Sequence, residues 1–306
     1  MWCELNVLRA VGQRWQLYVL FSLPLLYIIV FKYVPMLGAV IAFKDFSVTK
    51  GIYGSDWVGL KHFTRFFNSY EFGRLMTNTI SISLYTLIAS FPFPIMLALG
   101  LNMVKNQRFK KSVQMVTYAP YFISIVVLVG LIMQILDPRT GILNQLLAAI
   151  GFDPVNFMGK ASYFQSIYVW SHIWQNAGFS CIIFLAALSG IDPEMHEAAV
   201  VDGASKLRRM WHIDLPGIMP IAIILLILNT GQLLDTGFEK ILLMQNSLNL
   251  RASEVIDTYV YKVGLVSQAI NFSYATAIGL FKAIIGFGLL LIVNHTAKKL
   301  GQESLW

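Results

Sequence analysis

Two apolar stretches of the sequence carry polar and aromatic side chains that could bind a ligand. The candidates are Trp174, Gln175 and Asn176, beside Ser171 and His172, in one stretch, and Asn229, Thr230 and Gln232, followed by Asp235, in the other. Aromatic faces combined with amide and carboxylate groups suit a polyhydroxylated ligand such as a sugar. The alternative is hydrogen bonding between helices, a common role of buried Asn, Gln and Ser in membrane helices.

Lys282 lies near the middle of a third apolar stretch. A charge at the centre of a membrane span costs on the order of 2.5–3.5 kcal/mol, so it needs a partner or a watery cavity. One hypothesis is that Lys282 faces the ligand path and offers a cation to an acidic ligand. The other is a structural ion pair or hydrogen bond. The sequence shows no acidic partner in the same apolar core.

Enzymatic sites find no support in the sequence. The five histidines, His62, His172, His196, His212 and His295, are not spaced as metal ligands. A phosphate-binding loop with Gly-Lys-Ser/Thr is missing, and no Ser or Cys has a nucleophile motif around it. Cys3 and Cys181 give no disulfide or metal framework. We therefore expect a chain that is not an enzyme and holds no metal.

One polar stretch, residues 197–220, carries sequence signals for two short helices joined by a turn. Asp192-Pro193 ahead of it predicts a helix start, because Asp caps free N–H groups and Pro suits the first helical position. Gly203 can turn the chain, and a second short helix is expected over 204–212, ended by Leu215-Pro216. Spacing alone also allows an ordinary loop with a helical hairpin.

Composition indicates the elements that must position these residues. Of 306 residues, 57% are hydrophobic and only 13% are charged, whereas a soluble domain has about 25% charged residues. The net charge of +7 is scattered among apolar segments, which indicates basic residues at a membrane surface rather than nucleic-acid binding.

Six segments are long and apolar enough to cross a bilayer, which takes roughly 20 residues. The predicted spans are 16–34, 79–101, 113–136, 164–188, 217–234 and 274–293. The first span should be retained, because a basic residue and a Val-Pro pair follow it instead of a cleavage pattern. Residues 1–15 precede the membrane domain, 16–306.

An even number of spans places both termini on one side of the membrane. The face with the shorter segments, including the loop with Lys105, Arg108, Lys110 and Lys111, has the higher density of basic residues. Basic residues in short loops mark the cytoplasmic side. We therefore expect cytoplasmic termini and a cytoplasmic loop at 189–216.

The stretch 197–220 resembles the coupling loop of membrane subunits of bacterial ABC importers, which carries the EAA motif. The matching positions are Glu197, Ala198, Ala199, Asp202, Gly203, Ala204, Ile213, Leu215 and Pro216, and Arg208 lies in the same loop. The resemblance implies two short helices that dock on a cytoplasmic ATPase subunit and transmit ATP-driven motion to the spans.

Further motifs resemble one branch of sugar-importer permeases, those for oligosaccharides and uronic-acid polymers of the alginate or aldouronate type. They are P-M-x-G, I-A-F-K-D-F, G-S-x-W-V-G-L and F-x-x-F-F within 35–67, T-N-T (77–79), Y-A-P-Y-F-I-S (118–124) and A-T-A-I-G-L-F (275–281). In similar permeases the fourth and fifth spans help line the path. The external segment 33–67 fits either a membrane-interface segment or a docking site for a binding protein.

The resemblance implies an all-α membrane protein with the type I ABC importer permease fold, in the bacterial plasma (inner) membrane. It implies import of an oligosaccharide or acidic polysaccharide, such as alginate or an oligo-uronate. The implied partners are a second homologous permease, as a heterodimer, two cytoplasmic ATPase subunits that bind ATP and Mg, and an extracytoplasmic sugar-binding protein. The alternative is an ion-coupled secondary sugar transporter, which would need ionisable relay groups inside the spans.

Overall fold

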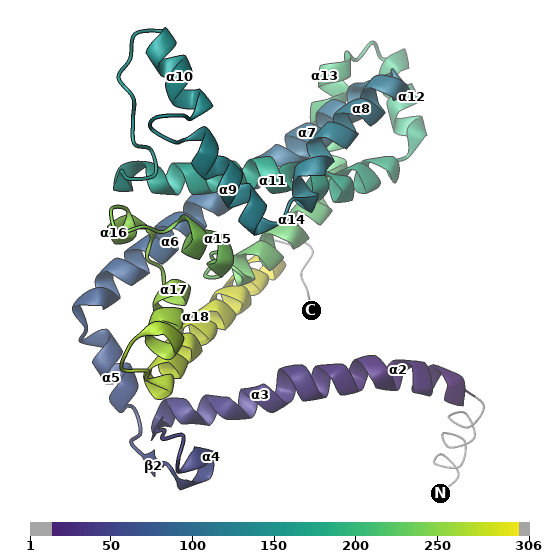
Figure 1. The fold of residues 1–306 in the computed structure, drawn as a ribbon. Helices are drawn as coiled ribbons and strands as arrows, with labels where there is room; N and C mark the ends of the chain where they lie inside the picture. Colours follow the sequence, from purple (N-terminus) through teal and green to yellow (C-terminus); the bar gives the residue numbers. More distant parts are fainter. Residues whose placement is uncertain (1–13, 300–306) are drawn as a thin grey trace, which may run out of the picture. The chain divides into compact units, whose positions relative to one another are not determined.

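The computed structural model describes residues 14–299 of the chain, which are mostly helical (Figure 1). Cys3 and most of the predicted N-terminal segment 1–15 lie outside the described residues. The chain divides into two units, one formed by the residues up to Phe67 with Val263–Leu280, and one formed by Asn68–Lys262 with the residues from Phe281 onward. Each unit is described by itself.

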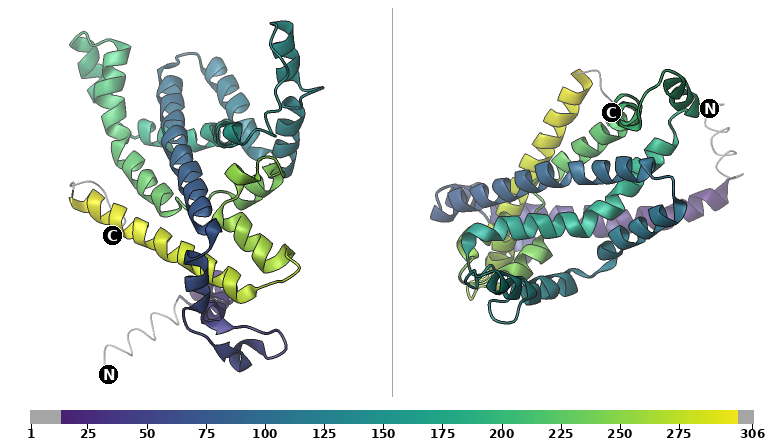
Figure 2. Two further views of the ribbon diagram at one scale, coloured as in Figure 1. Left: turned by 90° about the vertical axis from the view of Figure 1, so that its left-hand side faces the viewer. Right: turned by 90° about the horizontal axis from the view of Figure 1, so that it is seen from above.

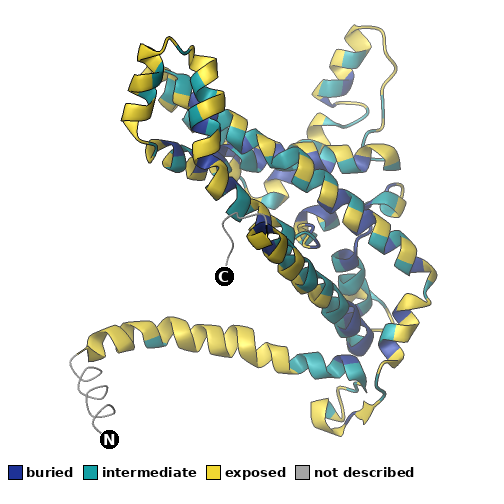
Figure 3. Cartoon of the chain, turned by 180° about the vertical axis from the view of Figure 1, so that it is seen from behind, coloured by how far each residue is buried: buried dark blue, intermediate teal, exposed yellow. Residues whose placement is uncertain are grey.

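The first unit begins with a continuous helical run that is longer than the predicted span 16–34. It consists of α2 (Trp15–Ile28), a π-helical turn (Ile29–Tyr33), α3 (Val34–Met36) and a 3-10 helix (Leu37–Phe43). None of the side chains of α2 is buried, and Figure 3 shows exposed residues all along this helix. An apolar helix exposed on all sides is suited to a lipid surrounding.

A small hairpin follows this helix. β1 (Lys44–Asp45) pairs antiparallel with β2 (Asp56–Trp57), and α4 (Gly51–Gly54) lies in the connection. Next come α5 (Lys61–Phe67) and, later in the chain, a π-helical turn (Lys262–Val266) and the start of α18 (Phe272–Lys299). Phe66 of α5 is buried edge-on against Tyr274 of α18, and the Arg65 guanidinium lies 4.5 Å from the centre of the same ring.

The second unit holds the remaining helices. They are α6 (Tyr70–Ser90), α7 (Pro92–Met103), α8 (Gln107–Tyr118), α9 (Ile125–Ile135), α10 (Ile142–Ala149), α11 (Ala161–Ser189), α12 (Pro193–Val201), α13 (Lys206–Arg209), α14 (Leu215–Gly231), α15 (Phe238–Met244), α16 (Leu250–Ser253) and α17 (Ile256–Tyr261). The long helix α11 packs against α6, α7, α8 and α14, and Figure 2 shows it running alongside α7. Two clusters of buried apolar side chains fill this packing, one around Val169 and one around Cys181.

The predicted third span, 113–136, is not one straight helix. A 3-10 turn (Ala119–Phe122) follows α8, and the axes before and after the break differ by 102°. Pro120 lacks a backbone N–H, and Ser124 caps α9 by accepting a hydrogen bond from the Val127 N–H at 3.4 Å. The motif Y-A-P-Y-F-I-S therefore encodes the break.

The expectation that Leu215-Pro216 ends a separate helix is wrong. From Lys206 the helix continues through a π-helical turn (Met210–Asp214) into α14. In this turn the Leu215 N–H bonds to the Met210 carbonyl, five residues back. The wider turn lets the helix continue into the following proline, and the same device precedes Pro35.

Within residues 14–299, four helices are long and apolar enough to span a membrane, or up to six if each of two bent helix pairs counts as one span. Each of the six predicted segments falls on one of these helices or pairs. The expected all-α membrane fold is therefore confirmed.

Candidate functional site

The second unit contains a cavity of about 960 Å³. Its walls come from α6, α7, the break before α9, α11, the end of α14 and the segment that leads into α15. Six of the candidate residues line it: His172, Gln175, Asn176, Asn229, Gln232 and Asp235. The structure therefore brings together amide and carboxylate groups from two stretches that lie more than fifty residues apart.

Four other candidate residues do not line the cavity: Ser171, Trp174, Thr230 and Lys282. Trp174 does not line the cavity, and its side chain is 53% exposed on another face of α11. Because a helix turns by about 100° per residue, the neighbours Trp174 and Gln175 point in different directions. Lys282 does not line the cavity either. Aromatic side chains that do line the cavity include Tyr168 of α11, which is buried, and Tyr121 and Phe122 at the break before α9, which are exposed.

Helix–helix hydrogen bonding, the alternative role for these residues, applies to one of them. Gln175 donates from Nε2 to the Ile123 carbonyl at 3.2 Å, which satisfies a backbone group at the break before α9. Asn176 bonds within its own helix, to the His172 carbonyl at 2.9 Å. Asn229 and Gln232 are exposed to the cavity. The last two are therefore the amide groups most available to a ligand.

Lys240 of α15 is a cavity residue that the sequence did not reveal. It occupies a short run, F-E-K-I-L-L-M, between the predicted fifth and sixth spans, where a lysine is ordinarily solvated. The spacing of the apolar residues in this run could have indicated a buried helix face. Ile241 and Met244 are fully buried and hold this face of α15 against the core. Lys240 itself is only 4% exposed.

Lys282 has the acidic partner that the sequence did not show. Its Nζ lies 2.6 Å and 2.7 Å from the two carboxylate oxygens of Asp257 on α17, and 4.0 Å from Oδ1 of Asp235. The Lys282 side chain is 18% exposed and that of Asp257 19%. Of the two hypotheses for this lysine, the structural ion pair is the one that the contacts support.

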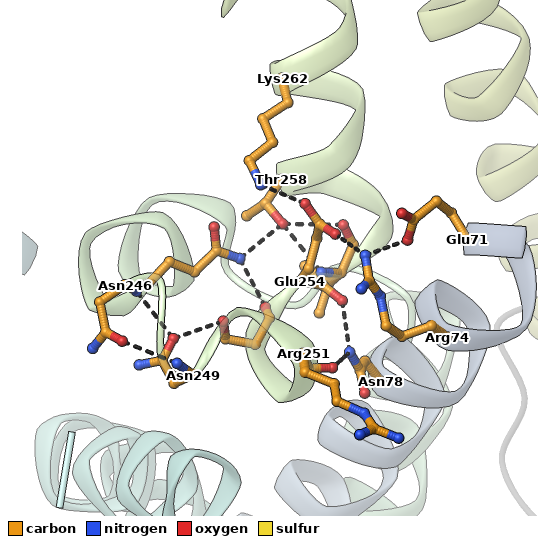
Figure 4. Close-up of polar contacts among 12 residues, drawn as sticks. Glu71, Arg74, Asn78, Asn246, Asn249, Arg251, Glu254, Thr258 and Lys262 are labelled. Atoms are coloured by element: carbon orange, nitrogen blue, oxygen red, sulfur yellow. Dashed lines mark hydrogen bonds and ion pairs between the residues drawn. The ribbon is translucent and has the colours of Figure 1, made fainter. Parts of the chain in front are cut away.

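A buried polar network holds the segment around α16 and α17 against α6 (Figure 4). Glu254, 3% exposed, accepts bonds of 2.5 Å from both Arg74 and Lys262, and Arg74 also pairs with Glu71. Asn78 donates to the carbonyls of Arg251 and Glu254, each at 2.9 Å. The T-N-T motif thus fixes the start of α17, the helix that carries Asp257.

The same network reaches the loop before α11. Asn246 and Asn249 both donate to the Met158 carbonyl, at 2.9 Å and 3.0 Å, and Gln245 donates to the Ser253 carbonyl at 2.9 Å. The segment after α15 is therefore held by hydrogen bonds on two sides. Although this segment lies between the predicted fifth and sixth spans, Val255, Ile256 and Thr258 at the start of α17 are fully buried.

The loop 189–216 forms two helical pieces, as its sequence predicts. Asp192 caps α12 by accepting the Glu194 N–H at 3.0 Å, and Gly203 has a φ of +73°, which only glycine adopts without strain. Ser205 caps the second piece at the Arg208 N–H. Glu197, Ala198 and Ala199 lie on α12, Asp202 and Ala204 flank the glycine, and Leu215 and Pro216 begin α14. Figure 1 shows α12 and α13 side by side at one end of the unit.

Asp214 ties this loop to the end of α7. Its Oδ1 accepts from Asn102 Nδ2 at 3.3 Å and lies 3.3 Å from His196 Nε2, while its side chain is only 6% exposed. A smaller cavity of about 440 Å³, lined in part by His196, Glu197 and Arg209, lies beside these contacts. The loop is therefore attached at both ends to long helices of the cavity wall.

Comparisons with known proteins agree with this architecture. Residues 90–302 match the family described as binding-protein-dependent transport system inner membrane component. The chain is 43% identical, over 98% of its length and 92% of the relative's, to the Bacillus subtilis polygalacturonan/rhamnogalacturonan transport system permease protein YteP. It is 42% identical, over 96% of its length and 91% of the relative's, to Protein LplB of the same organism.

Solved structures give the same result. A crystal structure of a bacterial ABC transporter involved in the import of the acidic polysaccharide alginate matches with a TM-score of 0.89 and 36% identity, covering 97% of this chain and 100% of that one. A second crystal structure, of a bacterial alginate ABC transporter in complex with an alginate pentasaccharide-bound periplasmic protein, matches equally well.

These matches confirm the family and the permease fold that the 197–220 motif and the other motifs implied, together with a multi-pass location in the inner membrane. The family name describes a membrane component that works with a binding protein, in agreement with the expectation of a non-catalytic subunit. The chain belongs to the family of binding-protein-dependent transport system inner membrane components, the permease subunits of ABC importers.

Proposed function

We propose that this permease imports an acidic oligosaccharide, a chain of uronic-acid units, delivered by an extracytoplasmic binding protein. The observation that carries the proposal is the 43% identity, over nearly the whole chain, to a permease named for polygalacturonan and rhamnogalacturonan. The alginate importer, similar in fold at 36% identity, supports the same substrate class.

The cavity fits this substrate in size and chemistry. Its volume of about 960 Å³ is near the upper end for ordinary ligand sites, about 300–1,000 Å³. Asn176, Asn229, Gln232 and Asp235 offer donors and acceptors for sugar hydroxyls. We place the substrate path here, between α11 and the end of α14.

The loop 189–216 is proposed to be the coupling loop. Its two helical pieces, with Glu197, Ala198, Ala199, Asp202, Gly203, Ala204 and Arg208, dock on an ATPase subunit, and Leu215 and Pro216 pass the motion into α14. The continuous helix from Lys206 to Gly231 supports this role, since α14 ends at the cavity. Both termini and this loop are cytoplasmic in the proposal.

The complete importer contains four further components in this proposal. A second, related permease forms a heterodimer with this chain, two cytoplasmic ATPase subunits bind ATP and Mg, and a sugar-binding protein docks from outside. ATP-driven closure of the ATPases moves the coupling loop, and the spans alternate between outward-open and inward-open states.

An ion-coupled sugar carrier is the competing function. Lys282 does have a carboxylate partner, Asp257, so a missing acid no longer counts against an intramembrane relay. The coupling loop still favours the ATP-driven importer, because a carrier driven by an ion gradient has no use for an ATPase docking site.

The test is to express the chain with its neighbouring subunits, purify the complex in lipid nanodiscs and measure ATP hydrolysis. Binding protein loaded with an oligogalacturonate should stimulate hydrolysis at a lower sugar concentration than binding protein loaded with a neutral oligosaccharide. Import that persists without any ATPase subunit, driven by a proton or sodium gradient, would establish the carrier instead.

A further inference from the structure

Lys240 is a buried base with an open side toward the cavity. The Tyr168 hydroxyl donates to the Thr236 carbonyl at 2.5 Å, which fixes the segment that leads into α15. The buried side chains of Ile241 and Met244 then hold the helix itself. Lys240 lies between these two anchors and lines the cavity, with 4% of its surface exposed.

The contacts of Lys240 leave its charge without a counter-charge. Its Nζ donates to the Tyr168 carbonyl at 3.4 Å and lies 5.0 Å from the centre of the Tyr168 ring. Among residues 14–299, no carboxylate lies within ion-pair distance of this amine. Burial lowers the pKa of Lys240 to about 7. A buried ammonium in this situation gains most from an anion that enters from the cavity.

Among the described residues, the one carboxylate on the cavity wall is that of Asp235. Asp235 lies 4.0 Å from Lys282, which itself binds Asp257. Within residues 14–299, the wall therefore offers amides, one carboxylate that also lies near Lys282, and the amine of Lys240, which is paired with no acid.

We propose that Lys240 is the specificity-determining residue of the path and binds the carboxylate of a uronic-acid unit. This assignment rests on the proposed import of acidic oligosaccharides and names the residue that recognises the carboxylate of the sugar. The amides of Asn229 and Gln232 take the hydroxyls that acidic and neutral sugars share, so they do not discriminate between them.

The experiment uses the complete importer in nanodiscs and two probes, trigalacturonate and its methyl ester. The ester keeps the sugar rings and removes the negative charges. The quantity measured is the ratio of the half-saturating concentrations of the two probes for stimulated ATP hydrolysis. Because the same binding protein is used throughout, a change in this ratio between permease variants reports the permease.

We expect Lys240→Gln to reduce the preference for the acid by about tenfold or more, the usual effect of losing a charge-assisted hydrogen bond. Lys240→Arg should keep most of the preference. Lys160→Gln, which removes an exposed lysine outside the cavity, should change nothing. As a second readout, trigalacturonate should raise the melting temperature of the unaltered complex without binding protein, and should not raise that of Lys240→Gln.

An unchanged acid-to-ester ratio in Lys240→Gln overturns the role of this lysine and leaves the proposed function intact. A complex that no longer assembles would also contradict it, since that result would show that the amine holds a structural pair. If trigalacturonate does not stimulate ATP hydrolysis by the unaltered complex, the proposed substrate class is wrong, and so is the role of Lys240 that depends on it.

Discussion

Two buried lysines of this permease differ in what faces their charge. Lys282 lies inside a long apolar helix and is bound by both carboxylate oxygens of Asp257. Lys240 lies in a short helix between spans and meets only a backbone carbonyl and a tyrosine ring. Lys282, whose position in an apolar span indicated a function, is neutralised by Asp257 within the chain. Lys240, in a segment between spans, faces the cavity.

Depth in an apolar segment therefore does not identify a functional charge. A buried charge with a partner serves the fold, because removing either member leaves the other uncompensated. A buried charge without a partner lowers the stability of the fold, and it is retained only where a functional benefit offsets this loss. The contrast between the two lysines yields the predictions that follow.

The largest effect is expected from breaking the ion pair. Asp257→Asn removes the close counter-charge of Lys282 and leaves only Asp235, at 4.0 Å. This change should destabilise the complex by about 3–5 kcal/mol. Asp257→Asn combined with Lys282→Gln should recover most of this loss, measured as the melting temperature of the purified complex. The matched control is Lys50→Gln, which breaks an ion pair of 3.0 Å whose members are 53% and 74% exposed and should cost less than about 1 kcal/mol. Equal losses in Asp257→Asn and Lys50→Gln would remove the distinction between buried and exposed pairs.

Lys240→Met should stabilise the complex, whereas Asp257→Asn should destabilise it. Because burial lowers the pKa of Lys240 to about 7 from the ordinary 10.5, the unfolded chain binds the proton more tightly between these values. This lysine therefore destabilises the fold most below pH 7, and its cost fades as the pH rises toward 10.5. Lys240→Met should raise the melting temperature, more at pH 6 than at pH 9. A lower melting temperature at pH 6 would show that the amine is paired.

The affinity for acidic sugar should depend on pH through the same group. Tyr168 and His172 of α11 and Asp235 also line the cavity beside Lys240, whereas α9, which packs on α15, has no ionisable side chain. On α17, Asp257 is occupied by Lys282 and Tyr261 packs edge-on against Phe238. Lys240 loses its charge as the pH rises through about 7, so the affinity for trigalacturonate should fall between pH 6 and pH 8. The affinity for the methyl ester should stay constant, and Lys240→Arg should remove the dependence.

The coupling loop provides a test that leaves the cavity untouched. Gly203→Val forces a β-branched residue into a φ of +73°, at roughly 1–2 kcal/mol or more. Sugar-stimulated ATP hydrolysis should fall several-fold, while the acid-to-ester ratio stays unchanged. Gly151→Val is the matched control, since Gly151 has a φ of +87° and equally open surroundings in a loop far along the chain from residues 189–216. Similar losses in both variants would mean that the effect is not specific to coupling.

What the sequence predicted well is what it encodes locally. The cap at Asp192, the turn at Gly203 and the six apolar segments depend on neighbouring residues, and each is found as helix or turn where expected. The break at Ile123–Ser124 and the passage through Pro216 were missed, because both depend on how a proline is accommodated in three dimensions.

The cavity was predicted only in part for a related reason. Five amide and carboxylate residues were identified, but helix rotation excludes Trp174, which periodicity around Gln175 could have shown. The pair of Asp257 and Lys282 joins residues on two different helices across a connecting segment, so no local pattern reveals it. The role of Lys240 could not be predicted, because its burial results from the tertiary packing of α15, a short helix in a segment between two spans.

The most direct test places both lysines in one measurement. Lys240→Gln and Lys282→Gln are assembled in the same importer, and the melting temperature and the acid-to-ester ratio for stimulated ATP hydrolysis are recorded for each. We expect Lys282→Gln to lower the melting temperature and keep the ratio, and Lys240→Gln to lower the ratio about tenfold or more without lowering the melting temperature. A lowered ratio in Lys282→Gln, with an unchanged ratio in Lys240→Gln, would contradict this expectation.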